Sequence, residues 1–238
     1  MQKIIVFVLF FILHFQEANC QKTTDSSIYN WFDDQIGRQN LDINNGRIFK
    51  DIYPTVNNSS RYLENENYIV GEIEFDNQYY NNIYINYDLL KDELLLKPNG
   101  IKDRNSLIII KDKIKSFLIN DKKFVNLNYD KSINSIGLIG YYEEIISSNF
   151  ISFYVKHLKN LRNVYVENKI YYEYNLSNEF YIFYKNNFHK LDSKKSIQKL
   201  FPEYKSEINK FYQEKKQLEN DNKVLFIKTL LNYLNGLQ

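Results

Sequence analysis

Three carboxylates that crowd one short stretch of the chain are the first candidates for chemistry. Asp88, Asp92 and Glu93 lie close together in the sequence, and hard cations such as Ca²⁺ bind clustered oxygen ligands. The spacing of an EF-hand loop is missing, however, and acidic residues are common in turns. We therefore favour ordinary turn residues over a calcium site, and we expect no metal and no cofactor.

Glu143 and Glu144 are the obvious acid pair. A glycosidase needs two carboxyl groups that face one cleft. Neighbouring residues on a strand point to opposite faces of the sheet. If this segment is a strand, the two side chains are ordinary strand charges and not a catalytic pair.

His157 and His189 are the only histidines outside the first twenty residues. His157 shares a face with Ile151, Phe153 and Val155, which predicts a histidine at the end of a sheet, whereas His189 follows a turn and should be exposed. A zinc site needs several ligands at close spacing, which this chain lacks. Nucleophile, phosphate-binding and dinucleotide-binding motifs are also missing, so we expect no catalytic residue.

Tyr79, Tyr80 and Tyr84 form the candidate ligand surface. Exposed tyrosine rings could form a platform for sugar rings, and an exposed aromatic face marks a binding surface. The chain holds 21 tyrosines within a composition skewed toward Ile, Asn, Lys, Tyr and Phe. Ordinary strand aromatics are therefore the competing interpretation.

Alternating apolar residues from Tyr68 onward predict the strands that must position these groups. Residues 69, 71, 73 and 75 of the segment Ile69–Phe75 share one face. Asp76-Asn77 suits a primed hairpin turn. The second strand of this hairpin covers residues 82–87, and a third strand over residues 93–97 continues the meander.

Three further strand pairs follow in the sequence. Aromatic and β-branched residues dominate them, as strands prefer. The pairs are 114–119 with 124–129, 138–146 with 151–158, and 164–174 with 179–184, the last pair joined by a loop over residues 175–178. So many closely spaced antiparallel strands indicate a sandwich or an open, curved sheet.

The apolar period becomes helical after Lys190. Pro202 suits the first turn of one helix, and Asp221 is the expected N-cap of the last helix, whose apolar face runs from Val224 to Leu237. We therefore predict a mainly β (α+β) fold with two amphipathic helices at its C-terminus.

The sequence divides into four parts without an obvious linker or repeat. Seven glycines and three prolines in 238 residues leave little room for a flexible linker. The expected parts are a signal peptide (1–20), an irregular N-terminal segment (21–67), an antiparallel β-rich body (68–191) and a helical segment (192–238).

The charge pattern argues against nucleic-acid binding. The net charge is +2, from 31 basic and 29 acidic residues whose signs are interspersed. Nucleic-acid-binding proteins usually carry a concentrated basic face. The short basic runs at 111–115 and 194–195 read instead as solvated surface.

The first twenty residues have the organisation of a signal peptide. Met1-Gln2-Lys3 is positively charged, and Ile4–Phe15 is an apolar run of the right length. Ala18-Asn19-Cys20 resembles a cleavage site, with Gln21 as the first mature residue. We therefore expect an exported protein of the periplasm, the cell surface or the extracellular space. Cleavage there removes the only cysteine, so the mature chain would have no disulfides.

Three alternatives to soluble export are weaker. A transmembrane anchor needs roughly 20 apolar residues, more than this run provides. Acylation of Cys20 in a lipoprotein favours Leu near the third preceding position and small residues just before the cysteine, where Glu17 and Asn19 stand. A buried N-terminal strand would show polar alternation. We expect no membrane span in the mature chain.

Part of the sequence resembles a group of uncharacterised bacterial secreted proteins. The likeness lies in Gly71–Asp76, Tyr79–Ile83 and Tyr87–Asp92, and later in Phe180-Tyr181-Ile182 with the lysine-rich helical tail. It would cover most of the mature chain. These motifs are structural, so the resemblance implies export and carries over no catalytic residue.

These observations favour a non-enzymatic envelope or extracellular protein that acts as a binding or structural module. Its partner could be a carbohydrate or another envelope protein. The first alternative is a secreted hydrolase of polysaccharide or peptide whose carboxylates come from separate strands. The second is an assembly partner that docks through its C-terminal helices, which exposed apolar residues along 224–237 would support.

Overall fold

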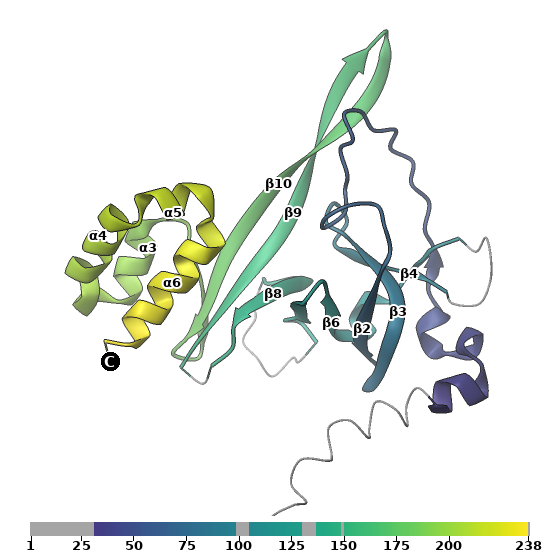
Figure 1. Ribbon diagram of the computed structural model, residues 1–238, viewed down its shortest axis with the longest axis horizontal. Helices are drawn as coiled ribbons and strands as arrows, with labels where there is room; N and C mark the ends of the chain where they lie inside the picture. The colour runs from purple at the N-terminus through teal and green to yellow at the C-terminus, as the bar shows by residue number, and fades with distance from the viewer. Residues whose placement is uncertain (1–30, 99–104, 130–136, 149, 238) are drawn as a thin grey trace, which may run out of the picture.

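The computed structural model describes residues 31–98, 105–129, 137–148 and 150–237. The expected signal peptide and its cleavage site at Cys20 and Gln21 lie outside these ranges. The described chain is mainly β, with helices at its C-terminal end (Figure 1). The predicted fold class is confirmed.

One antiparallel sheet of eleven strands forms the body of the described chain. Its order is β1-β5-β4-β3-β2-β6-β7-β8-β9-β10-β11, so β1 and β11 are its edges and the sheet is not closed. Most neighbours in the sheet are also neighbours in sequence, as in a meander. The strands are β1 Arg47–Ile48, β2 Ile69–Phe75, β3 Gln78–Asp88, β4 Glu93–Lys97, β5 Leu107–Ile108, β6 Ile114–Ile119, β7 Lys122–Asn126, β8 Tyr141–Ile146, β9 Ile151–Val166, β10 Lys169–Tyr184 and β11 Asn187–Lys190.

The first core lies on one face of strands β2 to β8. The alternation predicted for β2 is confirmed, because Gly71, Ile73 and Phe75 are buried. Rings of Tyr87, Phe117, Phe124 and Tyr141 meet at the centre of this core, with centroids 4.8 to 5.7 Å apart. Residues 41 and 43 of the N-terminal segment are buried in the same core.

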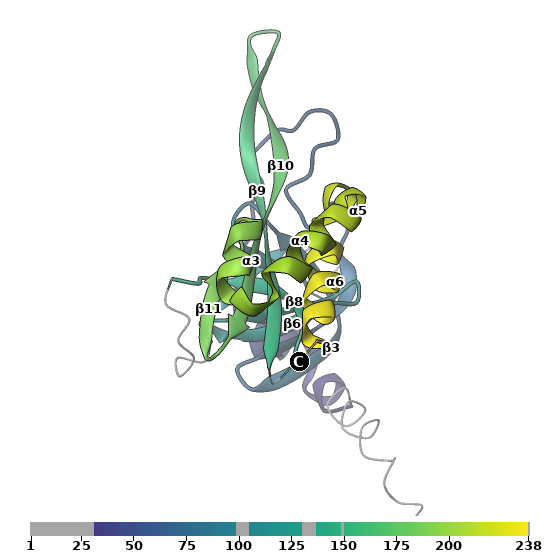
Figure 2. The same ribbon diagram turned by 90° about the vertical axis from the view of Figure 1, so that its left-hand side faces the viewer.

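The second core lies between the C-terminal helices and strands β9 and β10 (Figure 2). Ile151, Phe153 and Val155 of β9 point toward these helices, and the residues between them are buried as well, because the other face of this part of the strand is also covered.

The described helices are the 3-10 turns η1 Arg38–Asn40, η2 Asp42–Asn44, η3 Lys111–Lys113 and η4 Pro202–Tyr204, and α3 Lys194–Leu200, α4 Lys205–Glu214, α5 Lys216–Asp221 and α6 Lys223–Asn235; residues 31–36 are also helical.

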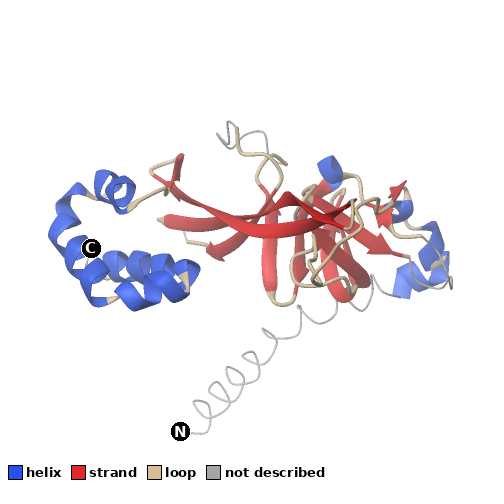
Figure 3. Cartoon of the chain, turned by 90° about the horizontal axis from the view of Figure 1, so that it is seen from above, coloured by secondary structure: helices blue, strands red, loops and turns tan. Residues whose placement is uncertain are grey.

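The C-terminal region contains four α-helices where the periodicity predicts two. Short breaks after Leu200, Glu214 and Asp221 separate them. The last helix begins one residue later than expected, because the side chain of Asn222, and not Asp221, accepts a hydrogen bond from the Leu225 backbone N–H at 2.9 Å. Seen from above, all four helices gather at one end of the sheet (Figure 3).

Strands β9 and β10 form one long hairpin, which corrects two predictions. The turn falls at Glu167-Asn168, where both residues have positive φ, and β9 extends to Val166 and not to residue 158. Residues 175–178 are not a loop, since they pair along their whole length with residues 157–160 of β9. The polar composition of residues 175–178 predicts a turn. In the structure, however, these residues form backbone hydrogen bonds to β9 at alternate positions, and the Asn178 side chain also bonds to His157 of β9.

Smaller differences concern the other strands. β3 begins at Gln78, before the expected start at residue 82, and a register shift against β2 lies beside Asn82, which has a φ of 55°. A bulge of this kind changes which side chains face the core. β7 ends at Asn126 and β8 begins only at Tyr141. The expected strands over 93–97 and 114–119 are confirmed.

Candidate functional site

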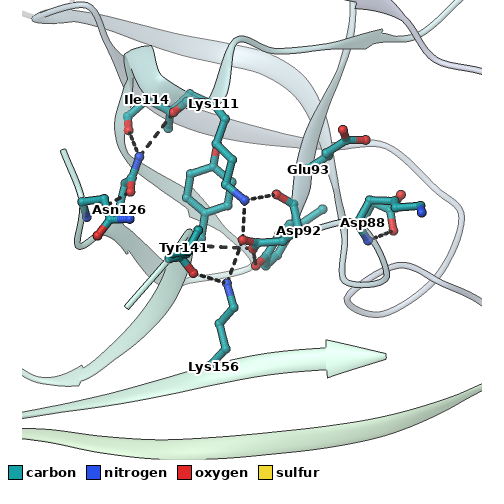
Figure 4. Close-up of polar contacts among 12 residues, drawn as sticks. Asp88, Asp92, Glu93, Lys111, Ile114, Asn126, Tyr141 and Lys156 are labelled. Atoms are coloured by element: carbon teal, nitrogen blue, oxygen red, sulfur yellow. Dashed lines mark hydrogen bonds and ion pairs between the residues drawn. The ribbon is translucent and has the colours of Figure 1, made fainter. Parts of the chain in front are cut away.

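The three carboxylates that could bind calcium each have a cationic partner of their own, and Figure 4 shows Asp92 between the two lysines with which it pairs. Asp88 pairs with Arg61, Asp92 pairs with two lysines, and Glu93 pairs with Arg47 at 2.9 Å. Within the described ranges no group of three or more His, Cys, Asp or Glu side chains is placed to hold a metal ion. The turn acids therefore serve as counterions within the fold, and the calcium hypothesis receives no support.

Asp92 is the centre of a polar cluster that joins separate parts of the sheet. Its Oδ2 lies 2.5 Å from the Nζ of Lys111, which follows β5, and 2.8 Å from the Nζ of Lys156 on β9. Its Oδ1 accepts a hydrogen bond of 2.5 Å from the hydroxyl of Tyr87. One carboxylate thus fixes the turn after β3 against the middle of β9.

The surroundings of Lys156 in this cluster are closed and well paired. Burial lowers the pKa of Lys156, and the nearby Asp92 carboxylate opposes that shift. The same ammonium donates to the Ile139 carbonyl at 3.2 Å and lies 4.9 Å from the centre of the Tyr142 ring. The Lys156 side chain is only 7% exposed, whereas that of Lys111 is 31% exposed, so the cluster holds most of its charge within the fold.

A second buried ion pair ties the N-terminal segment to the end of β3. Arg61 NH2 lies 2.5 Å from Asp88 Oδ2, and both side chains are almost fully buried. The other oxygen of Asp88 accepts hydrogen bonds from the backbone N–H groups of Leu90 and Lys91. The Arg61 guanidinium also lies over the Phe49 ring. Asp88 therefore shapes the turn after β3.

Glu143 and Glu144 lie on β8 and point to opposite faces of the sheet. Glu143 lies 2.5 Å from His157 Nε2, whereas Glu144 pairs with Lys123 at 2.8 Å. The two carboxylates do not face a common cleft. A catalytic pair between them is excluded by the strand geometry.

The structure corrects the expectations for both histidines. His157 is not at the end of a sheet, since β9 continues to Val166 and the ring lies buried between Glu143 and Asn178, with its Nδ1 2.9 Å from the Asn178 Oδ1. It links β8, β9 and β10. His189 lies in β11 and is half-buried, although an exposed side chain was expected.

A groove of about 460 Å³ lies on the face of the sheet opposite the first core. Val125, Leu127 and Tyr154 provide its apolar lining, and they pack in or against a small third cluster of buried residues. Tyr79 and Tyr129 supply two further rings. Clefts of this size that combine apolar surface with a few polar groups are the usual form of small-ligand sites.

Two lysine–glutamate pairs supply the polar groups of the groove. Lys115 lies 2.7 Å from Glu74, which also accepts a hydrogen bond of 3.3 Å from Ser116, and Lys123 lies 2.8 Å from Glu144. The hydrogen bond to Glu74 raises the pKa of Lys115. Two cations and two anions leave this lining without net charge, yet with many donors and acceptors.

The tyrosines singled out in the sequence do not form one surface. Tyr79 lines the groove and is 53% exposed, whereas Tyr80 is only 2% exposed and packs in the first core. Tyr84 is 45% exposed, but it lies opposite Val70, farther along the strand and outside the groove. The bulge beside Asn82 shifts the alternation of buried and exposed side chains between the two halves of β3. The sequence pattern does not reveal this shift.

Most of the groove comes from residues that sequence reasoning missed. Lys115, Lys123, Tyr129 and Tyr154 belong to strands, or to a loop, far from Tyr79 in sequence. Outward-facing positions on alternating strands were the available signal. Such positions become a site only when the strand order places them side by side.

The chain matches no protein-family model, no curated protein and no solved structure. None of the helices in the described ranges has both the length and the apolar character needed to cross a membrane.

Proposed function

We propose that this protein is an exported, non-enzymatic binding protein that holds a carbohydrate in the groove over strands β2, β3 and β6 to β9. The observation that carries the proposal is the groove lining, where tyrosine rings and two lysine–glutamate pairs stand together without net charge. The N-terminal sequence supports the export part of the proposal.

A sugar fits this combination of groups. The C–H face of a pyranose ring is apolar and packs on an aromatic ring, while its hydroxyl groups both donate and accept hydrogen bonds. Tyr79 and Tyr129 offer rings, and Glu74 and Glu144 offer acceptors whose positions are fixed by their lysines. A strongly charged ligand would find no excess of opposite charge in this lining.

The ion pairs of the two groove carboxylates favour binding over glycoside hydrolysis. Glu74 is on β2 and Glu144 is on β8. A glycosidase needs one carboxyl group that carries a proton and a second, ionised one that acts as base or nucleophile. Here Lys115 pairs with Glu74 and Lys123 pairs with Glu144, which favours the ionised form of both carboxyl groups.

A docking role for the C-terminal helices has less support. The apolar residues of α6, including Phe226, Leu230 and Leu234, pack into the second core. Leu225, Tyr233 and Leu237 are exposed in this region, but they lie apart from the buried face of α6. The helices therefore bury most of their apolar side chains against strands of their own chain.

The test of the groove is binding to a panel of polysaccharides and oligosaccharides, followed by calorimetric titration of the full chain with the best ligand. Tyr79→Ala should weaken binding about tenfold, or about 1.4 kcal/mol, through loss of one stacking ring. Tyr84→Ala is the matched control, because Tyr84 is on the same strand and similarly exposed but outside the groove. Equal losses in both variants would contradict the groove assignment.

Two further outcomes decide the rest of the proposal. Release of shorter products from a bound polysaccharide, abolished by Glu144→Gln, would replace it with the hydrolase alternative. Intact-mass measurement of the native protein in soluble and membrane fractions tests export, and we expect a soluble species that begins at Gln21. A membrane species that begins at an acylated Cys20 would contradict cleavage after Cys20.

A further inference from the structure

The outer half of the β9–β10 hairpin has one covered edge and one open edge. On the β10 side, residues 54–56 run beside the hairpin (Figure 1), and the Tyr172 backbone bonds to Pro54 and Val56. On the β9 side, β8 pairs only as far as Val155, and the last backbone contact is from Lys159 N–H to the Leu89 carbonyl at 3.3 Å. Among the described residues, no strand pairs with β9 on this side beyond that point.

The backbone groups on the open edge can be identified from the ladder. Lys159 directs its N–H away from β10, so the residues at alternate positions after it do the same. Tyr172 confirms this assignment. It lies opposite Asn163 in the ladder, and its own backbone N–H and C=O bond to residues outside the hairpin. The backbone N–H and C=O groups of Leu161, Asn163 and Tyr165 therefore face outward.

This edge lacks the usual protection against pairing with another strand. Exposed edges are normally blunted by proline, by unpaired lysines or by a bulge. From Asn160 to Val166 the strand has no proline and pairs with β10 in unbroken register. Arg162 is the only charged residue in this stretch, and Glu173 of β10 already pairs with it.

We propose that a second copy of this chain pairs with the open edge, antiparallel and centred on Asn163. A two-fold axis perpendicular to the sheet places Asn163 opposite Asn163 of the partner subunit, and Leu161 opposite Tyr165 of the partner subunit. All three outward-facing residues then form hydrogen-bonded pairs, with two hydrogen bonds in each pair. The two hairpins become one four-stranded ribbon.

The side chains along this edge are complementary to themselves in that register. Leu161 is 38% exposed and Tyr165 is 73% exposed, and the register packs each against the other across the interface, on the same face of the ribbon. Lys159 takes no part in this interface, because its Nζ donates to the backbone carbonyls of Ser60 and Tyr62 in its own chain. Because the same edge supplies both partners, a second copy satisfies the whole set of contacts.

Sedimentation analysis of the full chain tests this pairing. The wild-type protein should show a monomer–dimer equilibrium. Asn163→Pro should be monomeric, because it removes the central outward N–H while leaving the β9–β10 ladder intact, which is the position in a sheet that tolerates proline. Asn163→Thr keeps the N–H and should still dimerise. A wild type that stays monomeric at the highest attainable concentration, or a folded Asn163→Pro variant that dimerises, would overturn the proposal.

Oxidative cross-linking tests the register without relying on proline. In a Cys20→Ser background, Asn163→Cys should form a covalent dimer, because hydrogen-bonded pairs have a Cα separation of about 5.5 Å, within disulfide range. Asn160→Cys is the control, since it would lie about 20 Å from its counterpart in the partner. Cross-linking at 160 and not at 163 would disprove the register.

Discussion

At the scale of single residues, the position of Asp92 depends on the absence of a side chain at Gly140. A Cβ at this glycine would lie 1.6 Å from Asp92 Oδ2, and its φ of +85° is itself unfavourable for other residues. Asp92 cannot move aside freely, because two lysines and the Tyr87 hydroxyl hold it. Gly140 therefore lets the ion cluster form.

Gly140→Ala should lower the free energy of unfolding by about 4 to 7 kcal/mol, as the sum of a left-handed backbone cost and a disrupted buried ion pair. Gly137→Ala is the matched control. Its φ of +84° is nearly the same, but nothing lies within 4 Å of its Cβ position, so it should cost only about 1 to 2 kcal/mol. Urea unfolding measures both, and equal losses would show that the Asp92 contact carries no stability.

At the scale of elements, the N-terminus of α6 shows how one residue decides where a helix begins. Asn222 has extended dihedral angles, with φ of −151°, and its side chain accepts from the Leu225 N–H. Asp221 has an equally suitable side chain, but it lies in the last turn of α5 and accepts from Gln217 instead. Both residues are good N-caps by type, and the preceding helix determines which one has the required backbone geometry.

Asn222→Ala should therefore lower the free energy of unfolding by about 1 kcal/mol, through loss of the cap. Asp221→Ala should change it by no more than about 0.5 kcal/mol, as expected for an exposed side chain. Asn222→Asp should retain the wild-type stability, because Asp caps as well as Asn. Thermal and urea unfolding measure the three variants. A larger loss for Asp221→Ala than for Asn222→Ala would contradict this assignment.

At the scale of the whole molecule, buried tyrosines make the fold sensitive to alkaline pH. Burial raises the pKa values of Tyr80, Tyr174 and Tyr212 to about 12, from an ordinary value of 10. The unfolded chain thus loses these protons at a lower pH than the folded chain does. The stability that depends on them is complete below pH 10 and is lost as the pH rises toward 12.

We expect the free energy of unfolding to fall between pH 10 and 12, with a slope of up to about 1.4 kcal/mol per pH unit for each such tyrosine. Lys156 acts in the opposite direction, because burial lowers its pKa and the free energy of unfolding therefore rises with pH. That rise is complete above the ordinary lysine value of 10.5. Tyr80→Phe should reduce the slope by the contribution of one tyrosine, because it removes one ionisable hydroxyl group. Urea unfolding across this pH range measures it, and a constant stability would contradict the prediction.

The local pattern was sufficient for β2, where one face is buried and the other is polar, and for β4 and β6, whose short apolar runs are typical of buried strands. It failed at residues 175–178, where polar residues pair in the middle of β10. Local propensity there is weak compared with a continuous ladder to β9. It also failed at Tyr80, because a bulge is a property of two paired strands and leaves no mark on either one alone.

The sequence by itself determined a mainly β chain with a helical C-terminus, because alternating and helical apolar periods follow directly from burial on one face. It also identified Tyr79 as one candidate for a ligand surface. Only the tertiary structure decided that Tyr79 shares a groove with Lys115, Lys123 and Tyr154. Strand order and register bring these residues together, and both depend on contacts between segments that lie far apart in the sequence.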